Sequence, residues 1–89
     1  MRKQELTEEQ QEEFKWLMNA DTINEDVEIN EYGTLIWKDG TWEDGFWGGG
    51  IWKGGIWKGG YWEGRSMWSN LKQRYVEVKW DGYEFKEIN

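Results

Sequence analysis

Residues 36–65 read IWKDG-TWEDG-FWGGG-IWKGG-IWKGG-YWEGR, and this stretch decides the fold. Tryptophan recurs at every fifth position, and five of the six units end in Asp-Gly or Gly-Gly. These dipeptides tolerate the positive φ angles of a type I′ turn, which joins the strands of two-residue β-hairpins. The repeat therefore predicts three-residue strands joined by tight turns, in a single-layer antiparallel β-meander.

The predicted meander places six indoles in one row. Two-residue turns fix the register, so each tryptophan of the repeat faces the next, with Cβ atoms about 4.5–5.5 Å apart. The row consists of Trp37, Trp42, Trp47, Trp52, Trp57 and Trp62. It is either a hydrophobic core or an open binding platform. The core is favoured, because a single-layer sheet must cover one of its faces.

A five-residue repeat is also compatible with a β-helix, in which each unit forms one side of a square coil. Such a coil takes small or medium side chains on its inside. Six stacked indoles would overfill it at the packing density of protein interiors. We therefore expect the antiparallel meander.

Residues 7–18 are predicted to form an acidic amphipathic helix. Thr7 to Gln10 match the capping box, in which the threonine hydroxyl and the glutamine side chain satisfy free backbone amides. At helical spacing, Phe14 and Leu17 share an apolar face, whereas Trp16 projects among the glutamates. That position is awkward for an indole unless it packs on the sheet or on a partner.

The rest of the chain predicts strands within a single domain, residues 1–89. Residues 27–36 read as strand, turn and strand, and they open a repeat meander that spans residues 27–65. Residues 74–88 predict a C-terminal hairpin around Asp81-Gly82, with Lys79 opposite Glu84. The predicted fold class is mainly β with one N-terminal α-helix.

The Trp-x-x-Gly rhythm of residues 36–65 resembles the short-period tryptophan and glycine repeats of small phage and bacterial proteins. It is also similar, more loosely, to the hairpin repeats of MORN proteins, whose units are longer and begin with a Tyr/Phe-x-Gly that is missing here. The resemblance covers about a third of the chain. It implies a single-layer meander that serves as a scaffold or binding surface, and it does not extend to lipid binding.

The composition disfavours catalysis and cofactor binding. The chain has neither cysteine nor histidine, so it lacks thiolate metal ligands and the usual general base. Residues 48–50 are all glycine, but no Gly-Lys-Ser/Thr follows them. The acids of residues 21–28 lack the spacing and the turning glycine of a calcium loop. We expect a protein with no enzymatic activity, catalytic residue, metal site or cofactor.

The negative charge is concentrated in the N-terminal third. The formal net charge of the chain is −7, and residues 1–31 alone hold ten acids against three bases. This distribution disfavours direct binding to a nucleic-acid backbone and favours a protein partner with a basic surface. The candidate partner-binding residues are Glu8, Glu9, Glu12, Trp16, Asp21, Glu25 and Asp26. The alternative is that this segment is simply a solvated face.

The sequence thus predicts a non-enzymatic protein–protein interaction module. The narrower hypothesis is a small acidic phage or mobile-element inhibitor of a host nucleic-acid-handling or defence complex of the CRISPR kind. One alternative is a nucleotide- or carbohydrate-binding sponge that stacks ligands on exposed tryptophans. Another is a self-associating structural protein, because short strands leave edges that can pair. No apolar run reaches the roughly 18 residues of a membrane span, so we expect no membrane partner and a cytoplasmic location, that of a bacterial host if the protein is phage-encoded.

Overall fold

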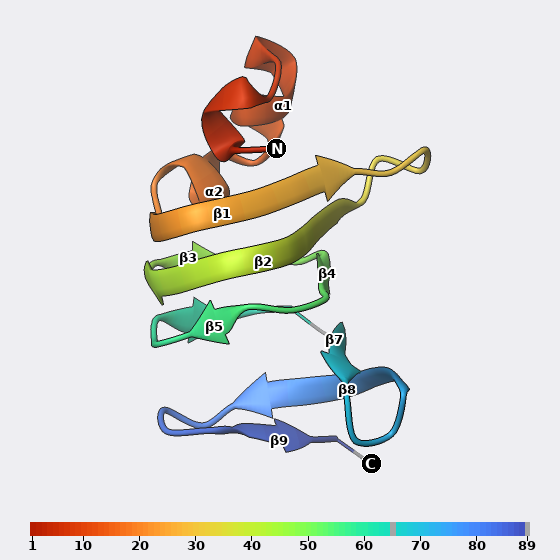
Figure 1. Ribbon diagram of the computed structural model, residues 1–89. Helices are drawn as coiled ribbons and strands as arrows, with labels where there is room; N and C mark the ends of the chain where they lie inside the picture. Colours follow the sequence, from red (N-terminus) through yellow and green to blue (C-terminus); the bar gives the residue numbers. More distant parts are fainter. Residues whose placement is uncertain (65, 89) are drawn as a thin grey trace.

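The computed structural model describes residues 1–64 and 66–88, and it shows a mainly β chain with a helical N-terminal end (Figure 1). A 3-10 turn at Lys3–Glu5 precedes the helices. The predicted fold class, mainly β with an N-terminal helical region and C-terminal strands, is confirmed. The elements are α1 (Glu8–Glu13), α2 (Lys15–Met18), β1 (Asp21–Ile29), β2 (Leu35–Asp44), β3 (Phe46–Trp47), β4 (Ile51–Trp52), β5 (Ile56–Trp57), β6 (Tyr61–Trp62), β7 (Ser66–Ser69), β8 (Arg74–Trp80) and β9 (Phe85–Glu87).

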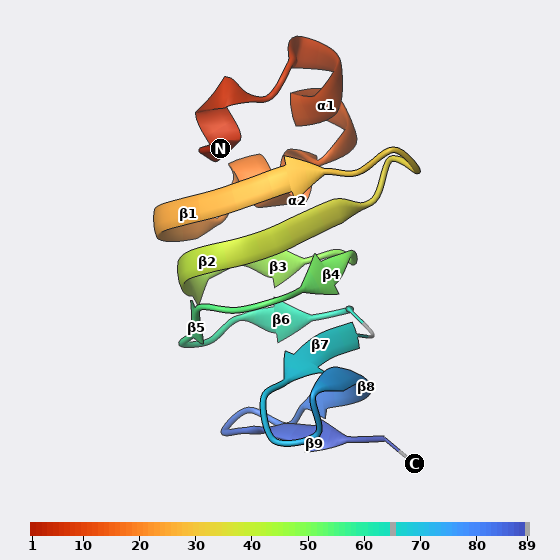
Figure 2. The ribbon, with the colours of Figure 1, turned by 45° about the vertical axis from the view of Figure 1, so that its right-hand side comes forward.

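Within the repeat, the strands pair in parallel, and the predicted antiparallel pairing of successive units is wrong. β2 pairs with both β4 and β5, and β3 pairs with β6. Each residue lies beside the one three units further along the chain, as Trp37 does beside Trp52. Three units therefore make one turn of a three-sided coil, whose successive turns stack on each other (Figure 2).

Most corners of the coil differ from the type I′ turns that the repeat predicts. A type I′ turn requires positive φ at both of its central residues. At Asp39-Gly40, only the glycine has a positive φ, of 107°. At Gly54-Gly55, again only the second residue does, with a φ of 95°. At Gly49-Gly50 both residues have positive φ, of 136° and 117°, and the chain still advances to the next side of the coil. Two positive φ angles therefore do not by themselves make the strand reverse.

β2 and β1 show the same bend. The ten residues of β2 run over two sides of the coil, with Gly40 at the corner between them. β1 pairs with β2 antiparallel, and its register shifts between Ile23 and Asp26. Asn24 lies in this irregular segment with a φ of 54°. The bulge allows the outer strand to follow the corner of the strand beside it.

The six indoles of the repeat fill the coil in two layers. Trp37, Trp42 and Trp47 form the upper layer, in which each pair of rings meets at 73–89° with centroids 5.5–6.3 Å apart. The three tryptophans of the lower layer, residues 52, 57 and 62, repeat this edge-to-face arrangement at 71–89°. Between the layers, rings stack nearly parallel, at 8–10°.

The six indoles fit inside the three-sided coil, although we expected them to be too large for the interior of a coil. The prediction that indoles would overfill the interior assumed a square coil. With three sides, each layer holds only three rings, and their edges meet the faces of their neighbours, which is a favoured geometry for aromatic pairs. All three upper rings are fully buried. The aromatic row is therefore the core.

Both ends of the aromatic core are covered. At the upper end, Leu17 and Trp16 of α2 pack on it, and the Trp16 ring centroid lies 5.1 Å from that of Trp47. At the lower end, the β8–β9 hairpin brings Phe85 to 4.9 Å from Trp62. Trp80 also contacts the lower layer, at 6.0 Å from Trp57. The helical end and the hairpin thus close the open ends of the coil.

The predicted helix over residues 7–18 is two segments. The capping box is confirmed: Thr7 Oγ1 accepts from the backbone N–H of Gln10, and Gln10 Oε1 accepts from the backbone N–H of Thr7. Phe14 then breaks the helix, with φ and ψ of −107° and 45°. This break changes the direction of the side chains that follow, so Trp16 packs on the core and does not project among the glutamates.

The C-terminal hairpin is present, but its predicted register is wrong. Asp81 Oδ1 accepts hydrogen bonds from the backbone N–H groups of Tyr83 and Glu84. This side-chain turn lengthens the loop, so Trp80 pairs with Phe85 and Lys79 lies opposite Lys86. The two backbone donors, with a smaller contribution from Lys86, lower the pKa of Asp81.

Tight stacking of the corners predicts a strong cost for a methyl group at Gly60. A Cβ there would lie well under 3.0 Å from the carbonyl oxygen of Gly45 in the turn above. We expect Gly60→Ala to lower the free energy of unfolding by about 3 kcal/mol or more, because overpacking adds to the strain of a positive φ. Chemical denaturation measures this difference.

Gly49→Ala is the matched control. Gly49 also has a positive φ, of 136°, but a Cβ there would meet nothing within 4 Å. We expect it to cost only the conformational strain, about 1–2 kcal/mol. Equal losses in the two variants would contradict the stacking of corner on corner.

Candidate functional site

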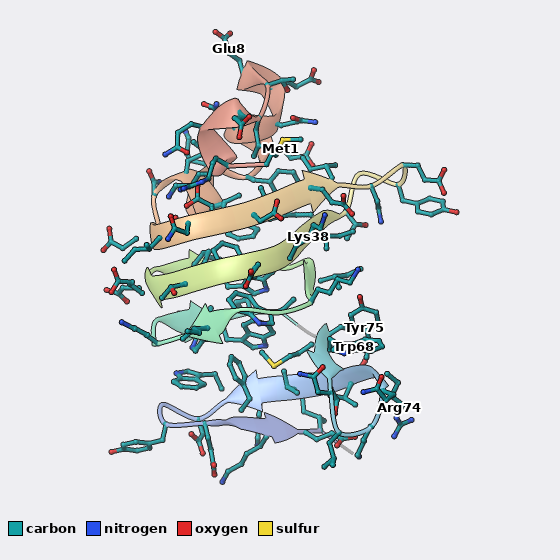
Figure 3. All side chains as sticks on the ribbon, in the orientation of Figure 1. Met1, Glu8, Lys38, Trp68, Arg74 and Tyr75 are labelled. Atoms are coloured by element: carbon teal, nitrogen blue, oxygen red, sulfur yellow. The ribbon has the colours of Figure 1, made fainter. Side chains whose placement is uncertain are left out.

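The acidic residues of the N-terminal third lie at one end of the molecule. The helices and β1 form this end, and the β8–β9 hairpin forms the other (Figure 1). Glu8 stands at the tip of the helical end (Figure 3). Residues 1–31 carry the excess of acids over bases, so the charge segregated in the sequence is also segregated in space.

Four of the seven candidate residues are exposed on this end. Glu8 and Glu9 lie in the first turn of α1, where the positive end of the helix favours carboxylates. Glu12 follows on the same helix, with its carboxylate 3.4 Å from Lys15 Nζ. Asp21 is exposed at the start of β1. We call these four residues the acidic surface.

Glu25 is not part of the acidic surface, because it is buried, with 3% of its area exposed. Its carboxylate accepts hydrogen bonds from the backbone N–H of Lys3 and the hydroxyl of Thr22. Lys3 is buried as well, and its ammonium donates to the carbonyl oxygens of Leu17 and Ala20 at the end of α2. Glu25 and Lys3 therefore hold the N-terminal segment against the helix and β1.

Burial and hydrogen bonding act in opposite directions on these two groups. Burial alone would raise the pKa of Glu25, but the hydrogen bonds from Lys3, from its own backbone N–H and from Thr22 outweigh it, so the pKa is lowered. For Lys3, burial lowers the pKa, and the negative charges of Glu25 and Asp21 only partly oppose it. Each of the two charged groups is thus held by its own hydrogen bonds, the ammonium by backbone carbonyls and the carboxylate by the backbone N–H of Lys3 and the hydroxyl of Thr22.

Asp26 and Trp16 also have structural roles. The Asp26 carboxylate lies 2.6 Å from the ammonium of Met1, whose hydrogen bond lowers the pKa of this aspartate. Trp16 lies across the upper layer, and a Cβ on Gly48 would collide with its indole. Sequence position alone did not separate these anchoring residues from the exposed acids.

The burial of the aromatic row argues against a nucleotide- or carbohydrate-binding sponge. Of the six indoles, only Trp57 is more than 9% exposed. A ligand therefore finds no row of open rings to stack on. Five indole N–H groups, those of residues 37, 42, 47, 57 and 62, are buried without a hydrogen-bond acceptor among the described residues. The edge-to-face geometry offers them ring faces, to which an N–H donates weakly.

The sequence did not predict a groove of about 260 Å³, which lies beside the lower layer where the coil meets the C-terminal hairpin. Its lining includes Trp57, Lys53 and Trp68. The signal in the sequence was the loss of the five-residue rhythm after residue 65, where SMWSN stands in place of a unit that ends in Gly-Gly.

Comparisons with protein-family models, with curated proteins and with solved structures find no match to this chain. The resemblance to phage and MORN-like repeats stays a prediction, and the parallel coil differs from the hairpin repeats that it implied. Residues 1–64 and 66–88 contain no cluster of three acidic, cysteine or histidine side chains arranged to hold a metal ion. No helix in the described part of the chain has the length and hydrophobicity of a membrane span.

The buried Glu25 predicts a pH-dependent loss of stability on substitution. We expect Glu25→Gln to lower the free energy of unfolding at pH 7 by about 2 kcal/mol, because the backbone N–H of Lys3 and the hydroxyl of Thr22 lose a charged acceptor. A carboxylate with a lowered pKa stabilises the fold above its unfolded value of about 4.3 and loses this effect as the pH falls through the folded value. The gap between the parent and the variant should therefore close below about pH 4 in urea denaturation.

Glu28→Gln is the control on the same strand. The Glu28 carboxylate is half exposed and lies 3.8 Å from Lys38 Nζ. An exposed ion pair contributes less than about 1 kcal/mol, so this variant should stay close to the parent at every pH. A Glu25→Gln variant that behaves like Glu28→Gln would contradict the anchoring role.

Proposed function

We propose that the protein is a non-enzymatic binding module whose acidic surface contacts a basic surface of a protein partner. The observation that carries this proposal is that the aromatic side chains pack inside the coil, whereas the exposed carboxylates lie together at one end of the molecule. Five of the six indoles of the repeat are buried, and Trp57 is only partly exposed. The exposed carboxylates of Glu8, Glu9, Glu12 and Asp21 lie at one end of the molecule. The coil then serves as a rigid support for this end.

The electrostatics favour a basic protein over a nucleic acid. Like charges repel, and the chain as a whole carries −7. Binding to a phosphate backbone takes clustered lysine and arginine, whereas residues 1–31 hold only three bases against ten acids. A concentrated patch of one sign accelerates encounter with a patch of the opposite sign, and this acceleration falls steeply with salt.

The narrower proposal concerns the class of partner. Proteins that handle nucleic acids expose basic grooves to phosphates, and the carboxylates of an exposed acidic helix can occupy the same groove. Inhibition of such a host complex by a phage or mobile-element protein is the biological setting that the sequence suggested. Charge complementarity supports the kind of surface, and the setting itself is a proposal that rests on the resemblance.

Charge reversal tests the acidic surface. The immobilised parent captures partners from a bacterial lysate, and the captured protein is then purified and titrated. We expect Glu8→Lys, Glu9→Lys and Glu12→Lys together to weaken its binding at least about tenfold at low salt, mainly through the association rate. The fold should survive, since each charge near a helix N-terminus contributes only about 0.3–1 kcal/mol.

The matched control reverses three exposed acids away from this surface: Glu63, Glu77 and Glu84. Both triple variants change the net charge equally, so only the position of the charges differs. The control should bind nearly as the parent does. Equal affinity and equal salt dependence of the parent and both variants would make the acidic surface only a solvated face.

A further inference from the structure

The groove arises where the third turn of the coil is left unfinished. β7 continues the first side of the coil and pairs in parallel with β4, so Met67 lies beside Trp52. The second side is not continued, because the chain turns at Asn70 and enters β8. Below β5, the hairpin takes the place of a further strand. Between the coil and this hairpin the groove is open to solvent, with a volume of about 260 Å³.

The floor of the groove is aromatic. Trp57 and Phe85 line it, with ring centroids 5.6 Å apart, and Trp52 and Met67 complete the apolar part. Trp57 is the most exposed indole of the repeat. Indoles of the two layers stack on each other at 5.0–5.7 Å, and Trp57 uses one of its faces in this way against Trp42. A flat ring in the groove can contact the exposed part of Trp57 and the ring of Phe85.

Two of the residues that line the groove, Lys53 and Asn70, have side chains that donate hydrogen bonds. Lys53 has no ion-pair partner within residues 1–64 and 66–88. The equivalent lysines of the coil differ, since Lys38 pairs with Glu28 and Lys58 with Glu43.

The orientation of the Asn70 amide adds a second donor. Its Oδ1 accepts a hydrogen bond from the indole N–H of Trp68, at 3.0 Å. With the oxygen occupied, the NH₂ group of this side chain is the end that remains to donate. The groove lining therefore combines an ammonium and an amide donor, and both favour an anionic oxygen.

We propose that this groove binds a small planar aromatic carboxylate, with its ring on the Trp57 and Phe85 floor and its carboxylate at Lys53 and Asn70. The groove volume of about 260 Å³ lies just below the roughly 300 Å³ at which sites for drug-sized ligands begin. The groove therefore suits a smaller ligand of one or two fused rings. The anion is not excluded by the net charge of the protein. The acidic surface is at the opposite end of the molecule, and salt at 0.15 M screens exposed charges beyond about 8 Å.

Paired probes test the ring and the carboxylate separately. ¹⁵N-labelled protein is titrated with 2-naphthoate and with 2-naphthamide, which has the same ring system without the charge. We expect naphthoate to shift the amide signals of Gly54, Gly55 and Asn70, with naphthamide binding about fivefold more weakly, the effect of one exposed charge pair. Absence of shifts at these residues with either probe would overturn the proposal.

Three variants locate the carboxylate. Lys53→Gln should weaken naphthoate about fivefold and leave naphthamide unchanged. Lys79→Gln is the control, because Lys79 is also exposed and has no ion-pair partner among the described residues, but it does not line the groove. Asn70→Asp keeps an acceptor for Trp68 and replaces the donor with a like charge, so it should weaken naphthoate at least as much. Equal naphthoate affinity in Lys53→Gln and Lys79→Gln would overturn the assignment of the carboxylate.

The groove is independent of the proposed partner surface. The triple reversal of Glu8, Glu9 and Glu12 should leave naphthoate affinity within about twofold of the parent, since these charges lie beyond the screening length. Loss of naphthoate binding in that variant, with the fold intact by its amide spectrum, would contradict a local site.

Discussion

The contact between indole and indole is the interaction on which the rest of this structure depends. Only 37% of the 89 residues are hydrophobic, and each buried aromatic removes about 150–250 Å² from water. At about 25 cal/mol per Å², one tryptophan contributes roughly 4–6 kcal/mol of burial. Ring stacking also demands turns of the coil at the strand spacing of about 4.8 Å. At that spacing, corner lies on corner, and Gly60 cannot carry a side chain against the backbone of Gly45. Glycine recurs because the tryptophans must stack.

Much of this fold could be predicted from local patterns. The capping box at Thr7, the inward direction of all six indoles, the positive φ of Gly40 and the hairpin after Arg74 each depend on residues close together in the chain. The pairing could not be predicted in the same way. A unit of five residues permits the next strand either to return or to advance. The residues of one unit do not decide between them, since the chain advances even at Gly49-Gly50, where both φ angles are positive. The sequence did contain one signal of a coil. Residues three units apart are similar, as the aromatic residues Phe46 and Tyr61 are, and these two lie side by side in the structure.

The candidate site shows the same division. Its sign and its place in the chain follow from counting charges. Which carboxylates are exposed cannot be counted in this way, because Glu25 is buried and bonded to the backbone of Lys3, a residue 22 positions away. Trp16 likewise looked exposed under a continuous helix, and it became part of the core because Phe14 interrupts that helix. Long-range packing, rather than residue type, separates the anchoring residues from those that can meet a partner.

The repeat itself leaves little room for recognition, since each unit uses its indole inside and its glycines at the corners. Distinct surfaces therefore arise where the repeat ends. At the N-terminal end, the cover of the coil is built from a glutamate-rich helix. After residue 65, the loss of the Gly-Gly corner sends the chain away from the second side and leaves Trp57 partly exposed beside Lys53. A coil that cannot tolerate change in its units can still vary at both ends, because there each residue contacts only one neighbouring turn. The acidic surface and the groove are both located at such ends, and the closed aromatic core between them holds both in place.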